Sequence, residues 1–254
     1  MSTLLVESTK PQAFSPIEYP SSDGQPMAET ETHVLAILHL IGALRHFFRK
    51  VPDIYVIGNI FLYYIEGNSN ARKSPDVMVV KGVGKHTRRS YKLWEEKVAP
   101  SVIFEITSRQ TKSEDTVGKL SLYAALGVKE YFMFDPLHEY LEHQLEGYRL
   151  VEGAYEVIPA NEDGELYSEE LQLILRPEAG LLRLVDPQTH HPLPDLDEAV
   201  ERAEQEAQRA TQEAQRAAQE AQRAQEEARR ADAAEAEAAR LRALLEQMKS
   251  GHTP

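Results

Sequence analysis

The chain has 254 residues, of which 42% are hydrophobic and 27% are charged, and it carries a formal net charge of -13 at pH 7. It contains no cysteine, which excludes disulfides, thiolate nucleophiles and cysteine-ligated zinc or iron–sulfur centres. The acidic balance argues against a surface covered with basic residues for nucleic acid, although it is compatible with a local basic patch.

Composition divides the sequence into three parts. Residues 1–27 form an irregular arm with the turn signal SSDGQP, residues 28–195 resemble a globular domain, and residues 196–254 are rich in Ala, Glu, Gln and Arg. No segment approaches the length of apolar sequence that spans a membrane, and the first residues lack the pattern of a signal peptide. We therefore expect a cytoplasmic protein with no membrane segment.

The globular part begins with a predicted helix over about residues 28–50. Apolar residues at helical spacing form its predicted core face: Val34, Ile37, Leu38, Ile41, Leu44 and Phe48. His39 and His46 fall on the opposite face, which favours a solvated pair over a metal site.

Strands and one further helix follow. DIYVIG and NIFLYYIEG are β-rich runs separated by a Gly-Asn turn, and SPDVMVV, SVIFEIT and EYFMFDP predict three more strands. SEDTVGKLSLYAALG predicts a helix that ends at its glycine. Residues 139–186 alternate like β-hairpins, with turns expected at EGY, EGA and EDGE. These elements predict one α/β domain with a mixed central sheet flanked by helices.

The last part repeats EAQRATQ, EAQRAAQ and EAQRAQE with a period of seven. This heptad pattern is typical of a long helix that can form a coiled coil. Two alanine columns result: Ala207, Ala214, Ala221 and Ala228, and Ala210, Ala217, Ala224 and Ala231. Because alanine buries little area, two interpretations stay open: a solvated helix laced with charges, or a helix that assembles the chain into a homodimer.

Two acids occupy places where strands should be buried. Both faces of SVIFEIT are largely apolar, so the carboxylate of Glu105 sits in a dry element and is costly unless something compensates its charge. Asp76, at the head of SPDVMVV, faces a milder form of the same problem. If the two strands are neighbours, the acids meet at one sheet edge, where Mg²⁺ or Mn²⁺ would relieve their repulsion.

Each acid also has a purely structural interpretation. Asp76 follows a proline and could simply close a turn, and Glu105 could pair with a buried arginine. Lys119, in the next predicted helix, could pair with Asp115 one turn earlier. Asp135 is typical of an acid that ends a strand at a turn. These explanations weaken when taken together, because two acids at one edge would need two unrelated reasons.

Several motifs in order resemble a known family. SPDVMVV, then VIFEITS, then the D…K…Y pattern of SEDTVGKLSLYAALG, then GVKEYFMFDP are similar to the Uma-two family of restriction-endonuclease-like proteins, a branch of the PD-(D/E)xK nuclease superfamily. The resemblance runs over about residues 15–190, and an alanine-rich helical tail is also common in that family. It implies a restriction-endonuclease-like fold, with a mixed central sheet flanked by helices and a long C-terminal helix.

The resemblance also implies a metal-dependent phosphodiesterase. Asp76 and Glu105 would bind Mg²⁺ or Mn²⁺, with the carbonyl of Ile106 completing the ligand shell. PMAETETH resembles the first helix of the family, so Glu29 would also contribute to the metal site.

The catalytic lysine departs from the superfamily pattern. The residue two after Glu105, where the superfamily places a lysine, is Thr107. In this branch the lysine comes from the following helix, and Lys119 matches that position. The resemblance therefore implies Asp76, Glu105 and Lys119 as catalytic residues.

Positive charge collects beside these acids in the sequence. The candidate nucleic-acid-binding residues are Lys85, Arg88, Arg89, Lys92 and Arg109. The leading hypothesis is a Mg²⁺- or Mn²⁺-dependent endonuclease that cleaves DNA. The alternative is a catalytically inactive nuclease-fold protein that binds or scaffolds partners through its C-terminal helix. Thr107 favours the alternative, whereas the retained acids and Lys119 favour the enzyme.

Overall fold

The computed structural model describes residues 17–22, 30–107 and 118–250. The chain divides into two compact units, Met1–Leu196 and Asp197–Pro254.

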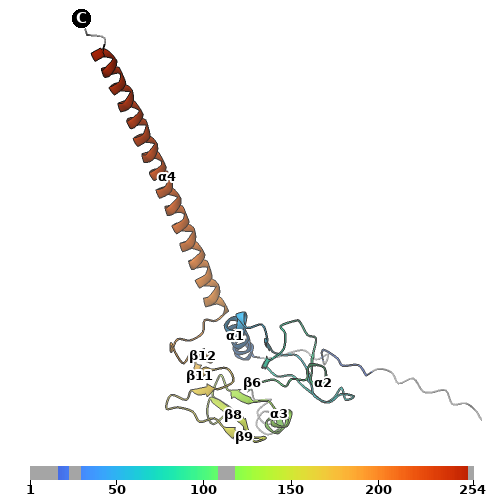
Figure 1. Ribbon diagram of the computed structural model, residues 1–254. Helices are drawn as coiled ribbons and strands as arrows, with labels where there is room; N and C mark the ends of the chain where they lie inside the picture. The colour runs from blue at the N-terminus through green and yellow to red at the C-terminus, as the bar shows by residue number, and fades with distance from the viewer. Residues whose placement is uncertain (1–16, 23–29, 108–117, 251–254) are drawn as a thin grey trace, which may run out of the picture. The chain divides into compact units, whose positions relative to one another are not determined.

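The first unit is built around a six-stranded sheet (Figure 1). In spatial order its strands are β1 (Ile54–Ile57), β4 (Val77–Lys81), β6 (Val102–Ile106), β7 (Glu130–Phe134), β8 (Leu145–Val151) and β9 (Ala154–Val157). β6 and β7 pair in parallel and the other neighbours are antiparallel, which confirms the predicted mixed sheet. β6 and β7 are buried along their whole length because packed layers cover both faces.

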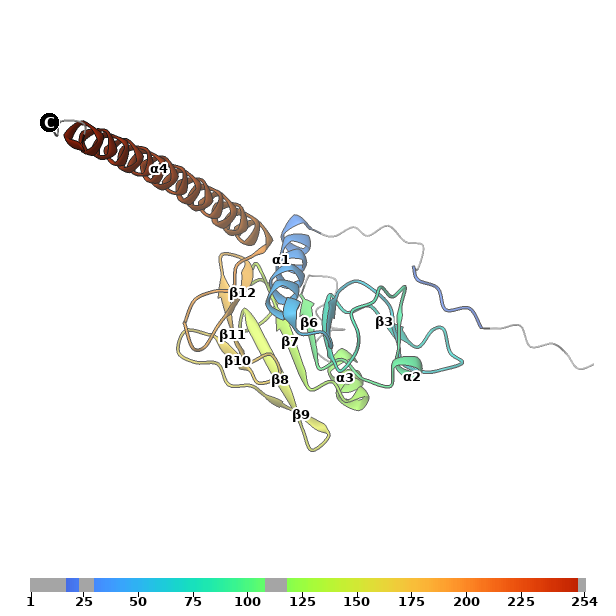
Figure 2. The ribbon, with the colours of Figure 1, turned by 45° about the horizontal axis from the view of Figure 1, so that its top comes forward.

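One face of this sheet is covered by α1 (Glu31–Phe47) and by a three-stranded sheet. The covering strands are β10 (Leu166–Ser168), β11 (Leu173–Glu178) and β12 (Leu181–Val185). Figure 2 shows α1 beside β12, with which it makes extensive contact.

The other face is covered by α3 (Leu120–Leu126) and by residues of a second small sheet. The strands of that sheet are β2 (Leu62–Tyr63), β3 (Arg72–Lys73) and β5 (Tyr91–Lys92). The short helices η1 (Phe48–Lys50) and α2 (Leu93–Glu96) complete the unit. The strand β2 is much shorter than the run NIFLYYIEG predicts.

Local signals place the helix ends that border the site. α1 begins after Thr30, whose side-chain oxygen accepts a hydrogen bond from the amide of His33 at 3.3 Å. α3 ends at Gly127, which has a φ of 82°, a left-handed conformation that glycine adopts without strain. The end of α3 at Gly127 is the one predicted from the sequence, and α1 begins at Glu31 rather than at about residue 28.

The buried face of α1 differs from the predicted one. Val34 and Leu38 are 42% and 60% exposed, whereas His39 is buried rather than solvated. Ala36 and Ala43 lie fully buried instead, because small side chains let the helix approach the sheet closely. The predicted buried face is based on large apolar residues alone, so it does not include these two alanines.

One predicted turn also proves wrong. The Glu-Gly-Tyr sequence at 146–148 lies inside β8, whereas the glycines of EGA and EDGE do lie in turns. A Cβ at Gly147 would come within 2.8 Å of the Phe132 ring. This glycine is therefore required by close packing between β8 and β7 rather than by a turn.

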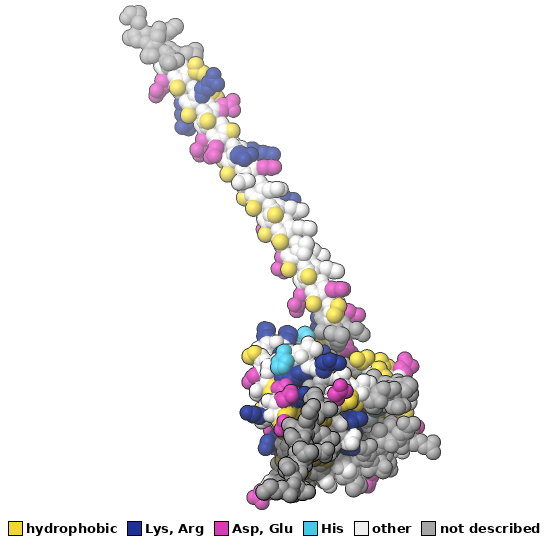
Figure 3. Space-filling view, turned by 90° about the vertical axis from the view of Figure 1, so that its right-hand side faces the viewer, with side chains coloured by type: hydrophobic (Ala, Val, Ile, Leu, Met, Phe, Trp, Pro, Cys, Tyr) yellow, Lys and Arg dark blue, Asp and Glu magenta, His cyan; other side chains and the backbone are white. Residues whose placement is uncertain are grey.

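The second unit contains α4 (Leu196–Ser250), a continuous helix of 55 residues. At 1.5 Å per residue it is about 80 Å long. From Val200 to Glu246 every side chain is exposed except that of Ala238, which is half-buried. Figure 3 shows its apolar side chains exposed between charged ones. The predicted long helix is confirmed, and among the described helices none is long and apolar enough to cross a membrane.

Candidate active site

The two acids singled out in the sequence occupy opposite positions in the register of two adjacent strands. β4 and β6 are antiparallel neighbours, with Val77 opposite Phe104. Continuing this register by one residue places Asp76, just before β4, opposite Glu105 in β6. Because side chains alternate along a strand, Glu105 lies with Ile103 on the face of the sheet that α3 covers.

Asp76 connects three elements. Its Oδ2 accepts a hydrogen bond of 2.7 Å from the amide of Ile106, at the end of β6. Its Oδ1 lies 3.6 Å from Nε2 of His33, in the first turn of α1. The side chains of Asp76 and His33 are 15% and 6% exposed. The carboxylate therefore extends the hydrogen bonding between β4 and β6 and lies beside the start of α1. Asp76 thus does more than close a turn, which is its purely structural interpretation.

Glu105 is compensated by two side chains from the next helix. Its Oε2 lies 2.9 Å from the ammonium nitrogen of Lys119, and its Oε1 accepts a hydrogen bond of 2.8 Å from the hydroxyl of Tyr123. Lys119 and Tyr123 are four residues apart, so they project from the same side of one helical turn. Glu105 and Lys119 are 1% and 7% exposed. The buried charge is thus paired with a lysine rather than with an arginine.

The oxygen-rich surroundings of the two acids suit a hard divalent cation. Within the described part of the chain, no three His, Asp or Glu side chains converge to hold a metal ion, so a cation would also draw on oxygens such as the Ile106 carbonyl. Each carboxylate oxygen has a second lone pair, so Glu105 can keep its donors and still face a cation. The hydroxyl of Thr107 is buried and has no hydrogen-bond partner among the described residues, which leaves one more oxygen nearby. The residues present therefore fit a hard divalent cation.

Comparison with known proteins identifies the family of this chain. The Uma2 family, described as "Putative restriction endonuclease", matches residues 14–176, well over half of the chain. The chain belongs to the Uma2 family. The resemblance inferred from the sequence motifs is thereby confirmed.

One solved structure similar to this Uma2 chain is a putative nuclease belonging to DUF820 from Anabaena variabilis ATCC 29413. It shares 14% sequence identity, covers 61% of this chain and 82% of its own, and superposes with a TM-score of 0.46. No curated protein matches the chain.

The predicted nucleic-acid-binding residues are held in different ways. The ammonium of Lys85 donates to the carbonyls of Phe48 and Arg49 at 2.6 and 3.3 Å. Lys92 contacts Glu95 at 2.9 Å. Arg89 is exposed and makes no ion pair within the described residues. Arg109, predicted from its positive charge, and Glu29, which the family resemblance implies for the metal site, lie outside the described residues.

Arg88 is the most fully engaged of these cations. Its guanidinium donates two hydrogen bonds to the carboxylate of Glu96, at 2.6 and 3.0 Å, and lies 4.4 Å from the centre of the Tyr55 ring. The hydrogen bond to Glu96 raises the pKa of Arg88, and the same bond lowers the pKa of Glu96. Arg88 therefore organises the loop rather than projecting toward solvent.

Sequence reasoning missed three residues that support Asp76 and Glu105. His33 and Tyr123 contact the two acids directly. Gly58 packs against the backbone of Asp76 so closely that a Cβ would lie 2.0 Å from the Asp76 carbonyl oxygen. The tyrosine of the D…K…Y pattern was a usable signal, whereas the contact made by Gly58 depends on strand pairing that no local pattern reveals.

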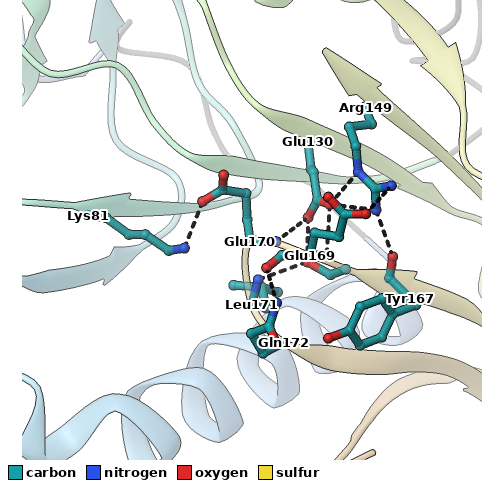
Figure 4. A network of polar contacts seen from close by, with 9 residues as sticks. Lys81, Glu130, Arg149, Tyr167, Glu169, Glu170, Leu171 and Gln172 are labelled. Carbon is teal, nitrogen blue, oxygen red and sulfur yellow. Dashed lines mark hydrogen bonds and ion pairs between the residues drawn. The ribbon is translucent and has the colours of Figure 1, made fainter. Parts of the chain in front are cut away.

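A second buried acid lies opposite the start of β6, and Figure 4 shows the polar contacts around it. Glu130, at the start of β7, is fully buried and accepts hydrogen bonds from the guanidinium of Arg149 at 3.1 and 3.2 Å and from the hydroxyl of Ser168. The amides of Glu169 and Glu170 also donate to it, at 2.9 and 3.3 Å. This carboxylate joins the central sheet to the turn between β10 and β11. Its donors come from the protein itself, so its role is structural.

Proposed function

We propose that this protein is an endonuclease that hydrolyses phosphodiester bonds in DNA and that requires Mg²⁺ or Mn²⁺. One observation carries the proposal: Asp76 and Glu105 occupy opposite positions on adjacent strands, and a buried lysine contacts Glu105. Membership of the Uma2 family supports the same chemistry.

In this proposal Asp76, Glu105 and the Ile106 carbonyl hold the cation, and Glu29 joins them from the segment before α1. A bound cation of this kind polarises the scissile phosphoryl oxygen and makes water a better nucleophile near neutral pH. Lys119 supplies a fixed positive charge close to where negative charge develops on the phosphate.

The neighbouring residues have positioning roles. Tyr123 fixes one oxygen of Glu105 and leaves the other to Lys119. The amide of Ile106 fixes Oδ2 of Asp76, while His33 approaches Oδ1. Because these partners come from rigid elements, the two carboxylates are oriented before a cation binds.

The proposal is tested by incubating supercoiled plasmid with the purified protein and Mg²⁺ or Mn²⁺. Glu105→Gln and Lys119→Met should each lower the cleavage rate by about 100-fold or more, since each removes a group that acts on the reacting phosphate. Glu95→Gln is the matched control, because that carboxylate is 59% exposed and its ion pair is with Lys92 rather than with a group that contacts Asp76 or Glu105. Equal trace activity in the wild type and in Glu105→Gln would show that a contaminant cuts the DNA, and the proposal would fail.

A second candidate is a catalytically inactive binding or scaffold protein that assembles as a homodimer through α4. The observation that favours it is Thr107, which occupies the superfamily lysine position. The exposed alanine columns of α4 offer a surface for a second copy. In sedimentation measurements of the full chain, Ala214→Glu with Ala221→Glu should abolish a dimer, whereas the outward-facing Gln215→Glu should not. A monomeric wild type at all concentrations would exclude assembly through this helix.

A further inference from the structure

A pocket of about 480 Å³ lies along the outer edge of β1, the edge strand of the central sheet. Its walls come from the C-terminal end of α1 with η1, from the whole of β1, and from the loop at residues 85–88. Its polar lining is strongly cationic: Arg45, Arg49, Lys85, His86 and Arg88. Among the described residues that line it, none is acidic. This concentration of positive charge contrasts with the net charge of -13 of the chain.

The contacts inside the pocket leave positive charge available. Arg45 donates from Nε to the carbonyl of Val56 at 2.9 Å, and Arg49 donates from Nη1 to the carbonyl of His46 at 2.8 Å. A guanidinium has five donors, so both arginines keep further N–H groups for a ligand. Arg45, Arg49 and Lys85 have no carboxylate partner among the described residues.

A purely structural role accounts for only part of this arrangement. The carbonyls at the end of a helix attract cations, and Lys85 and Arg49 do cap the end of α1 and η1. Arg45, however, contacts a strand carbonyl rather than the helix end. Burial and the neighbouring charge of Arg49 lower the pKa of His46, which is consistent with an excess of positive charge here. Three cations without a carboxylate partner among the described residues are more than is needed to balance the partial negative charge at the end of one helix.

The pocket also lies close to the paired acids. Ile57, at the end of β1, is opposite Met78, and the next residue, Gly58, packs against Asp76. Three residues of strand separate Tyr55 from Gly58, or about 10 Å. That length corresponds to roughly three nucleotides along one DNA strand. A backbone that passes the acids can therefore reach the pocket.

We propose that the pocket between α1, β1 and residues 85–88 binds phosphate groups of the DNA backbone on one side of the scissile bond. This inference rests on the proposed nuclease function and adds Arg45 and Arg49 to the residues that bind the substrate. Arg88 shapes the pocket, while Arg45, Arg49 and Lys85 contact the phosphates. Base edges are not contacted, so binding at this pocket does not depend on nucleotide sequence.

The test measures binding of a short fluorescent DNA duplex by anisotropy, without divalent ions, over a range of salt concentrations. The variant carries Arg49→Gln and Lys85→Gln, and the control is Lys50→Gln, an exposed neighbour that does not line the pocket. Each lost phosphate contact should weaken binding about eightfold at about 0.1 M salt and reduce the salt slope by about 0.9. A single Arg49→Gln variant, whose side chain is exposed, gives a second measurement that does not depend on the helix-end contacts of Lys85.

The outcomes are distinct from those of the cleavage test. The double variant should bind much more weakly than the wild type, whereas Lys50→Gln should bind like the wild type. Equal binding by the wild type and the double variant, or an equal loss in Lys50→Gln, would overturn the pocket assignment even if the protein cuts DNA. A labelled mononucleotide that binds as tightly as the duplex would show a small-molecule site and would also overturn it. Weakened binding in the variant beside an inactive wild type would leave the pocket standing and refute the nuclease.

Discussion

Replacing Lys119 by methionine removes the only ammonium that contacts Glu105 among the described residues. Methionine keeps most of the side-chain volume, so the main effect is that a carboxylate that is 1% exposed loses its lysine partner. Breaking a buried ion pair on one side costs about 3–5 kcal/mol, a large part of the 5–15 kcal/mol that stabilises a typical domain. Removing both charges, with Lys119→Met and Glu105→Gln together, should cost much less than the sum of the single changes.

The assay is urea unfolding of the wild type, both single variants and the double variant in metal-free buffer. The free energies of unfolding give the coupling energy between positions 105 and 119, which should be about 3 kcal/mol. If Lys119→Met costs under about 1 kcal/mol, the carboxylate reaches water or another donor, and the argument for a dry, lysine-compensated acid is refuted.

Two further predictions concern the neighbourhood of this pair. Gly58→Ala should displace the backbone of Asp76, destabilise the fold by about 1–3 kcal/mol and weaken Mn²⁺ binding measured by calorimetry. Gly84→Ala is the control, because the nearest atom to its Cβ would be 3.8 Å away, and equal Mn²⁺ binding in both variants would contradict the prediction. The Arg88–Glu96 pair should contribute fully to the free energy of unfolding above pH 4.5. This contribution should disappear as the pH falls through the lowered pKa of Glu96. Unfolding free energies of the wild type and Arg88→Gln should therefore differ at neutral pH and converge in acid, and a constant difference would show that the pair is not responsible.

The sequence predicts much of the sheet because each strand carries its own signal. The apolar runs before and after Asp76 and Glu105 locate β4 and β6, and an acid beside such a run indicates a compensated charge. The same signal was present at Glu130 and was not used there. The hydrogen-bond donors to Glu130 come from residues far along the chain. The sequence alone therefore does not show whether such a buried acid is catalytic or structural.

Other features depend on long-range packing and cannot be read locally. The face that α1 buries is chosen by the sheet beneath it, which accepts Ala36 and Ala43 and leaves Leu38 exposed. Gly147 resembles a turn glycine until β8 is paired with β7. The pocket beside β1 combines cations from a helix and from a loop some 40 residues later in the chain, and only the folded edge strand brings them together.

Asp76 joins α1, β4 and β6, because one of its oxygens accepts a hydrogen bond from the Ile106 amide and the other lies 3.6 Å from Nε2 of His33. In the proposed function Asp76 would have two roles at once, because it would bind the cation and also connect these elements. Loss of activity in an Asp76→Ala variant would therefore be ambiguous. An inactive homologue could also keep the aspartate for its mechanical role alone, so its retention in a sequence is a weaker sign of catalysis than retention of the Glu105–Lys119 pair.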